Sequence, residues 1–133
     1  MALGRAREAL EAAQVCVERQ LYHSATSRAY YAMFWAAQVA LAHAGIRRSE
    51  WRHPALQASF VRELIRTRKR YPALLGQYFN RALQLRLDAD YRLKGVSQRQ
   101  AIQAVRWAQE FVAAITEETS HGPNSPGADE IPT

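Results

Sequence analysis

The feature that most constrains the fold is a long apolar stretch that runs from Ser24 to Ala44. It contains no glycine or proline and is rich in alanine, the residue that most favours a helix, so it is predicted to form one helix. Between Ala29 and Ala42 the only strongly polar side chain is Gln38, so this helix is apolar on nearly every side. A soluble protein keeps such a helix only by covering it with other helices. We therefore expect the rest of the chain to surround it, and we expect Arg28 to lie in the apolar interior and to need an anion.

Other segments carry the apolar periodicity of amphipathic helices. They run from Ala2 to about Arg19, from Pro54 to about Arg70, from Pro72 to about Lys94, and from Ser97 to about residue 118. Short connections between amphipathic helices favour antiparallel neighbours. The sequence therefore predicts an all-α, up-and-down bundle of four or five antiparallel helices over residues 1–120, with no convincing strand.

Several residues mark where these helices begin and end. Ser24 is the best cap candidate for the central helix, and Gly45 suits the left-handed position that follows a helix. Pro54 fits a first helical position. Ser97 and Gln100 have the spacing of a capping box for the last helix. The expected inner face of that helix comprises Ala101, Ile102, Val105, Ala108, Phe111, Val112 and Ile115.

Composition limits the compartment and the kind of protein. Cys16 is the single cysteine, so no intrachain disulfide can form, and it is expected to be a small core residue in a reducing cytoplasm. The central apolar run is shorter than the roughly 20 residues that span a membrane, so we expect no membrane segment. Residues 121–133 contain three prolines and two glycines without an apolar period, and they are expected to form a disordered tail.

The charge of the chain favours a polyanionic partner. Residues 1–120 contain 18 basic and 10 acidic side chains, which suits a nucleic acid, an acidic protein or simply a soluble basic surface. The helix after Pro54 ends in a basic cluster, which either interacts with the helix dipole or binds phosphates. This cluster comprises Arg62, Arg66, Arg68, Lys69 and Arg70.

Arg86 breaks the apolar seam of the fourth helix. The seam runs through Leu75, Phe79, Ala82, Arg86, Ala89 and Leu93. At about 100° per residue, Asp90 lies about 40° around the helix from Arg86, one turn further on. Two interpretations stay open and can coexist. In one, Arg28, Asp90 and Arg86 form a buried network that fixes how helices or subunits dock. In the other, Arg86 projects into a groove and its planar fork contacts phosphate. The two coexist if Asp90 pairs with Arg28 and leaves Arg86 free.

Two motifs in this pattern resemble one protein family. The run SRAYYAMFWAAQVAL at residues 27–41, followed by RLDADY at residues 86–91, resembles the small bacterial and archaeal HEPN-domain proteins with an S-R-A-Y-Y helix and an R-x-x-x-D-Y ending. The resemblance covers residues 1 to about 118. It implies a dimeric all-α bundle with the arginine motif in a cleft between subunits. It also implies a minimal nucleotidyltransferase as the antitoxin partner of a toxin–antitoxin pair, and it assigns the motif positions to Arg86, Asp90 and Tyr91.

The resemblance raises the question of catalysis. Catalytic members cleave RNA without a metal through an R-x(4–6)-H motif, but here the positions that could hold the histidine are Tyr91, Arg92 and Leu93. Tyr91 is also expected to point about 140° away from Arg86. Arg47 and Arg48 precede His53 at an allowed spacing, although short motifs of this kind also arise by chance. His53 therefore stays a candidate only if the fold or a dimer brings it to Arg86.

Two main hypotheses follow for a cytoplasmic homodimer. In the first, a HEPN-type toxin component binds RNA or a nucleotide through Arg86, with Arg28, Arg47 and Arg48 as further contacts, and the missing histidine argues against ribonuclease activity. In the second, the chain is a non-catalytic interaction module and its Arg/Asp set is structural. A metal-free ribonuclease that uses His53 is a third possibility. We expect no metal or cofactor, and we assign no role to the scattered His23, His43 and His121.

Overall fold

The computed structural model describes residues 2–91 and 95–120, and these residues form helices without a strand. The elements in chain order are α1 (Ala2–Glu18), α2 (Tyr22–His43), α3 (His53–Ser59), the π-helix η1 (Phe60–Thr67), α4 (Ala73–Tyr91) and α5 (Gln98–Thr119). The prediction of an all-α bundle is confirmed. The tail at residues 121–133 and the end of the fourth helix at residues 92–94 lie outside the described residues.

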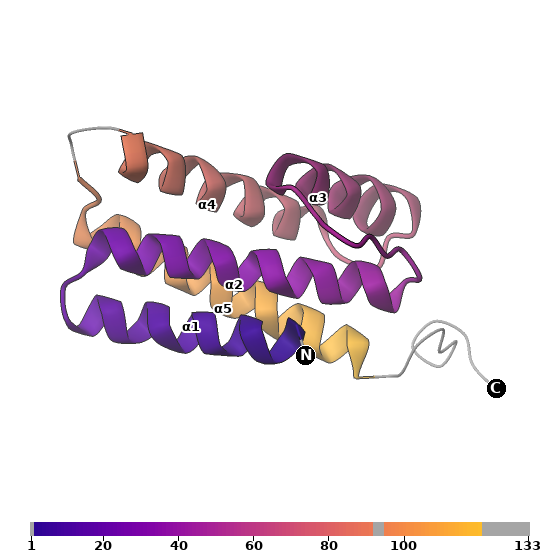
Figure 1. The fold of residues 1–133 in the computed structure, drawn as a ribbon, viewed down its shortest axis with the longest axis horizontal. Helices are drawn as coiled ribbons and strands as arrows, with labels where there is room; N and C mark the ends of the chain where they lie inside the picture. The colour runs from indigo at the N-terminus through magenta and orange to yellow at the C-terminus, as the bar shows by residue number, and fades with distance from the viewer. Residues whose placement is uncertain (1, 92–94, 121–133) are drawn as a thin grey trace.

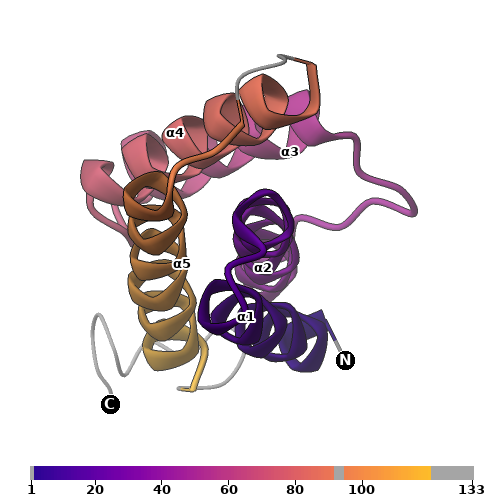
Figure 2. The same cartoon turned by 90° about the vertical axis from the view of Figure 1, so that its left-hand side faces the viewer.

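The apolar helix α2 is the centre of the bundle. It contacts α1, α3, η1, α4 and α5, and in the end-on view of Figure 2 these helices are arranged around it. Ala29, Ala32, Ala36 and Ala37 are fully buried, which lets neighbouring backbones approach closely. The interior is completed by aromatic residues that pack against one another, chiefly Tyr30, Phe60, Tyr71, Phe79 and Phe111. The prediction of one helix covered by all the others is thus confirmed.

The direction of α3 and η1 differs from the antiparallel expectation. His53 at the start of α3 contacts Tyr30 in the middle of α2, and Arg68 just after η1 donates a hydrogen bond to the carbonyl of Ala44 at the end of α2 (2.9 Å). Therefore α3 and η1 run in the same direction as α2. Figure 1 shows how this arises, because the connection after α2 returns along the bundle before α3 begins. α4 then runs antiparallel to α2, and this antiparallel pair carries the candidate site.

Helix ends follow the predicted caps at most positions. Ser97 Oγ accepts from the amide of Gln100 (3.1 Å), and Gln100 Oε1 accepts from the amide of Ser97 (3.0 Å), which confirms the capping box of α5. Gly45 follows α2 with φ of 86°, the left-handed conformation that was expected. Ser24 is not the cap of α2, because the helix already begins at Tyr22 after Leu21, and Leu21 provides no side-chain cap.

Further differences concern burial and helix type. Ile102 was placed on the inner face of α5 but is 37% exposed, whereas the other six predicted residues of that face are buried. Cys16 is half-buried at the edge of the core. The segment after Pro54 changes from α to π winding at Phe60, which the apolar pattern did not indicate. Within residues 2–91 and 95–120, no helix combines the length and the apolar character needed to cross a membrane.

Candidate functional site

Arg86 lies between α4 and α2 and is held by aromatic rings. Its guanidinium carbon is 5.2 Å from the ring centroid of Tyr31 and 5.5 Å from that of Tyr30. Nη2 donates a long hydrogen bond to Tyr31 Oη (3.4 Å). The Arg86 side chain is 21% exposed, so part of it still reaches the surface. The prediction of an arginine in the apolar seam of α4 is therefore correct, and its main neighbours are phenol rings.

One donor of Arg86 is left without an acceptor. The buried Nε atom makes no hydrogen bond to any described residue, although Asp90 Oδ2 lies 3.8 Å away. A distance of 3.8 Å permits electrostatic attraction but exceeds the range of an N–H···O hydrogen bond. The i, i+4 pair predicted on α4 thus exists as a loose ion pair. The pair is loose because Asp90 has a second and closer partner, His23.

Asp90 forms its short contact with His23 rather than with Arg28. His23 Nε2 is 2.8 Å from Asp90 Oδ1, with the two side chains 57% and 31% exposed. The carboxylate therefore bridges an imidazole at the start of α2 and a guanidinium near the end of α4. No sequence pattern singled out His23. The signal that could have found it is the antiparallel arrangement itself, which places the first turn of α2 beside the last turn of α4.

The predicted interior position of Arg28 is wrong. Arg28 is exposed and makes no ion pair among the described residues, so the buried Arg28–Asp90–Arg86 network does not form. Arg28 instead lines a cavity of about 530 Å³ between α1 and α2, together with Tyr31. Because Arg28 is exposed at this cavity, its charge can remain in water.

His53 joins the same cluster from the start of α3. Its Nδ1 atom is 2.8 Å from Tyr30 Oη, and its ring centroid is 4.4 Å from that of Phe34 and 5.7 Å from that of Tyr31. Burial lowers the pKa of the His53 imidazole below its usual value, and the positive charge of Arg86 lowers it further. The imidazole is therefore neutral near neutral pH. The sequence kept His53 as a candidate only if the fold or a dimer brought it to Arg86. Within one chain, both residues contact Tyr30 and Tyr31, so the fold brings them to the same place.

The phenol of Tyr30 connects these groups and stays protonated. Burial raises its pKa well above the usual value, an effect that Tyr31 reinforces and that the charge of Arg86 partly opposes. Tyr30 is fully buried, and its ring stacks in a tilted geometry on Phe79 of α4. It therefore fixes the relative positions of α2, α3 and α4 at the site. We call the set His23, Tyr30, Tyr31, His53, Arg86 and Asp90 the Arg86 cluster.

Besides Arg28, three of the predicted site residues lie outside the Arg86 cluster. Tyr91 is 82% exposed and makes no contact with Arg86, in agreement with the expected direction of its side chain. Arg47 and Arg48 are exposed on the connection after α2, where the guanidinium carbon of Arg48 lies 4.5 Å from the ring centroid of Trp51. They line a separate, mainly apolar cavity of about 620 Å³ that contains none of the residues of the Arg86 cluster.

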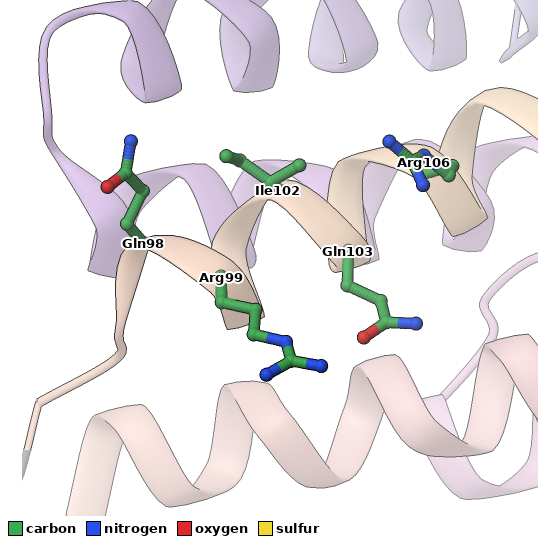
Figure 3. A pocket seen from close by; sticks show the side chains of 5 residues that line it. All are labelled: Gln98, Arg99, Ile102, Gln103 and Arg106. Atoms are coloured by element: carbon green, nitrogen blue, oxygen red, sulfur yellow. The ribbon is translucent and has the colours of Figure 1, made fainter.

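Another arginine-bearing surface lies on α5. Its cavity of about 500 Å³ is lined by Gln98, Arg99, Ile102, Gln103 and Arg106. In Figure 3 these five side chains leave a single helix, and none of them is aromatic. Charge is present at this surface, but a flat ring on which a base could stack is not. The lack of an aromatic ring in its lining distinguishes the α5 surface from the Arg86 cluster, which contains Tyr30 and Tyr31.

Comparisons with known proteins identify the family to which these features correspond. The HEPN domain family matches residues 1–119, which include every helix described above and all residues of the Arg86 cluster. A protein of Thermotoga maritima named "UPF0332 protein" is 33% identical over 112 residues, which cover 84% of this chain and 83% of that protein.

Proposed function

The chain belongs to the HEPN family, and we propose that it binds RNA or a nucleotide through Arg86. The observation that carries this proposal is the state of the guanidinium. It is fixed against two phenol rings, remains partly exposed, and has a buried Nε donor without an acceptor. Such a donor is costly to leave unpaired, so its retention at this position favours a role in binding.

The surroundings of Arg86 suit an anion. The rings orient the planar guanidinium, whose fork of N–H donors fits two oxygens of a phosphate. Asp90 would compete with a phosphate for this charge, but its short contact is made to His23. Asp90 Oδ2 stays 3.8 Å from Arg86 Nε, beyond hydrogen-bond range, so the N–H donors of Arg86 remain for the ligand.

We extend the proposal to a biological role. The S-R-A-Y-Y and R-x-x-x-D-Y motifs favour the branch that pairs with a minimal nucleotidyltransferase, so the chain would be the toxin component and a homodimer. The exposed Tyr91 is then accessible to the partner enzyme. Transfer of a nucleotide from a nucleoside triphosphate would join Tyr91 Oη to the α-phosphorus, break the α–β phosphoanhydride bond to release pyrophosphate, and pass the phenol proton to solvent. Mass spectrometry after co-expression tests this step, and an unmodified Tyr91 would contradict it.

The binding proposal is tested with Arg86→Ala. We expect this variant to bind fluorescently labelled single-stranded RNA at least about tenfold more weakly, because a hydrogen bond from a charged donor is lost. Arg62→Ala is the matched control, since Arg62 is exposed and already pairs with Glu63 (3.3 Å). Circular dichroism and light scattering should show that both variants remain folded and keep the oligomeric state of the wild type.

The alternative is a non-catalytic helical interaction module. If Arg86→Ala splits the oligomer or lowers the melting temperature while ligand binding is unchanged, the Arg/Asp set is structural and the binding proposal is wrong. Toxicity on expression provides an independent readout. A toxic wild type and a harmless but folded Arg86→Ala variant would support the first proposal.

A metal-free ribonuclease is the second candidate function, and one observation favours it. Although the motif histidine is missing, two imidazoles, His23 and His53, contact the same cluster as Arg86. One imidazole would take the 2′-hydroxyl proton, and the 2′-oxygen would attack phosphorus. The 5′-oxygen would leave with a proton from the second imidazole, giving a 2′,3′-cyclic phosphate. Cleavage assays in EDTA with His53→Gln and His23→Gln test this reaction, and undiminished cleavage by both variants excludes it.

A further inference from the structure

The cavity between α1 and α2 adjoins the Arg86 cluster and has no role in the proposal above. It measures about 530 Å³ and is lined by Arg5, Glu8, Ala9, Ala12, Arg28, Tyr31 and Trp35. Tyr31 belongs both to this wall and to the Arg86 cluster, because its hydroxyl accepts the hydrogen bond from Arg86 Nη2. A ligand that reaches Arg86 on one side of Tyr31 can therefore continue into the cavity on the other side.

The cavity has aromatic rings where a base could stack. Tyr31 and Trp35 are half-buried and lie one helical turn apart on α2, so both project toward the same side. The guanidinium carbon of Arg5 lies 4.8 Å from the ring centroid of Trp35. The Arg5 guanidinium lies over this half-buried indole, so a nucleobase would stack on the outer face of the guanidinium or take its place on the ring. Proteins bind single strands through stacking of this kind and through cation–π contacts.

The charges in the wall separate the place of a base from that of a phosphate. Arg28 is exposed and makes no ion pair among the described residues, so its charge is available at the rim. Glu8 is exposed as well, and its carboxylate repels a nearby phosphate but accepts hydrogen bonds from N–H donors. This pair of charges suits a base with an exocyclic amino group beside Glu8 and a phosphate of the backbone beside Arg28.

We propose that this cavity binds one base of a single-stranded RNA whose phosphate is held by Arg86, and that Arg28 binds a neighbouring phosphate. The inference rests on the proposed function and names its ligand class, a single strand with an amino-bearing base at this position. Arg28 and Trp35 are seven residues apart, about 10 Å along α2, so a phosphate at Arg28 and a base at Trp35 lie at different points along one site. The α5 surface in Figure 3 offers arginines but no aromatic platform, so it lacks the features required for base stacking.

The test measures the affinity of labelled oligoadenylate, oligouridylate and duplex RNA by fluorescence anisotropy. The wild type should prefer oligoadenylate to oligouridylate, since uracil has no amino group, and should bind the duplex most weakly. Arg28→Ala should weaken binding of both single strands severalfold. Trp35→Leu should weaken oligoadenylate binding by about fivefold to a hundredfold, the range expected when one stacked base is lost. Glu8→Ala should remove the preference for adenine.

The control is a residue outside the cavity, and the contrary outcomes are defined by the cavity variants themselves. Arg99→Ala, at an exposed arginine of α5, should bind as the wild type does. Glu8→Ala and Arg28→Ala change exposed residues, so they decide the question even if Trp35→Leu fails to fold. The inference is overturned if these two variants bind like the wild type. It is also overturned if they change only the oligomeric state seen by light scattering, because the face would then be a protein interface.

Arg86→Ala separates this inference from the function on which it rests. Loss of binding in Arg86→Ala with wild-type binding in the cavity variants overturns the cavity site and leaves the function intact. Wild-type binding in Arg86→Ala with weakened binding in the cavity variants overturns the role of Arg86 and supports the cavity as the binding site. Weaker RNA binding both in Arg86→Ala and in the cavity variants supports a single site that includes Arg86 and the cavity.

Discussion

The side chain of Arg86 is stabilised by rings more than by charge. Tyr30 and Tyr31 contact the guanidinium, whereas Asp90 is 3.8 Å from Nε and closer to His23. An arginine that served only to fix helix packing would be expected to have its buried donor paired, because an unpaired buried donor costs about 1–3 kcal/mol. The packing of Arg86 on the two rings thus accounts for stability, whereas its unpaired donor and its charge are left for binding.

This separation gives the first prediction. Arg86→Met keeps an unbranched side chain of similar length on the two rings and removes both the charge and the unpaired Nε. We expect its free energy of unfolding to equal that of the wild type or to exceed it by about 1 kcal/mol, because the unpaired buried donor is removed while Asp90 stays partly exposed and keeps its contact with His23. RNA binding should be lost. Urea denaturation measures the first quantity, and a destabilisation of more than about 2 kcal/mol would show that Arg86 is structural.

The second prediction concerns His53 and pH. Its pKa is lower in the folded state than the unfolded value near 6.5, so the unfolded chain binds the proton more tightly. The stability contributed by neutral His53 is present above about pH 6.5 and is lost as pH falls below that value. Relative to His53→Gln, the wild type should therefore lose free energy of unfolding between about pH 7 and pH 5. Comparing the two proteins cancels the contributions of the groups that they share. A constant difference would contradict the prediction.

Single residues also show what the sequence could and could not predict. Arg86 could be placed because the seam of α4 has a regular period that one charged residue interrupts. The partner of Asp90 could not be identified, since His23 and Asp90 meet only when the offset between α2 and α4 is known. The predicted interior position of Arg28 was wrong because the apolar run that follows it does not indicate whether Arg28 itself faces the interior or the solvent.

At the scale of elements, caps were more predictable than helix type. The capping box of α5 needs only two side chains three residues apart, and it forms as its spacing predicts. The π-helix η1 begins at Phe60, which packs against Tyr71, Phe79 and Phe111, and these contacts are not visible in the local sequence pattern. Periodicity can find the segment after Pro54 but cannot distinguish its α-helical turns from its π-helical turns.

A pair of serine substitutions forms the third prediction. Ser97→Ala removes the side-chain acceptor for the amide of Gln100 and should lower the free energy of unfolding by about 1 kcal/mol. Ser24→Ala is the matched control. Ser24 lies inside α2 and is exposed, so alanine should leave stability unchanged or raise it slightly. Urea denaturation of both variants checks this, and equal losses would mean that α2 begins at Ser24 after all.

On the scale of the whole molecule, one connection decides whether the site forms. The segment between α2 and α3 returns along the bundle and brings His53 to the middle of α2 (Figure 1). Had α3 started beside the end of α2, the imidazole would lie far from Arg86. Helix periodicity does not specify this path, which is why the direction of α3 was wrong in the sequence prediction while the central position of α2 was right.

The overall positive charge leads to the last prediction, which distinguishes phosphate contacts from stacking. Residues 1–120 carry 18 basic and 10 acidic side chains, so attraction of RNA by the general surface would also decline with salt. A specific phosphate contact has a sharper signature, because each one released on a single strand changes the slope of log affinity against log salt by about 0.7. Arg28→Ala and Arg86→Ala should each reduce the slope by that amount, whereas Trp35→Leu should weaken binding at every salt concentration with an unchanged slope. Anisotropy titrations over a range of potassium chloride concentrations measure these slopes. A slope unaltered by either arginine substitution would mean that the phosphates lie elsewhere on the basic surface.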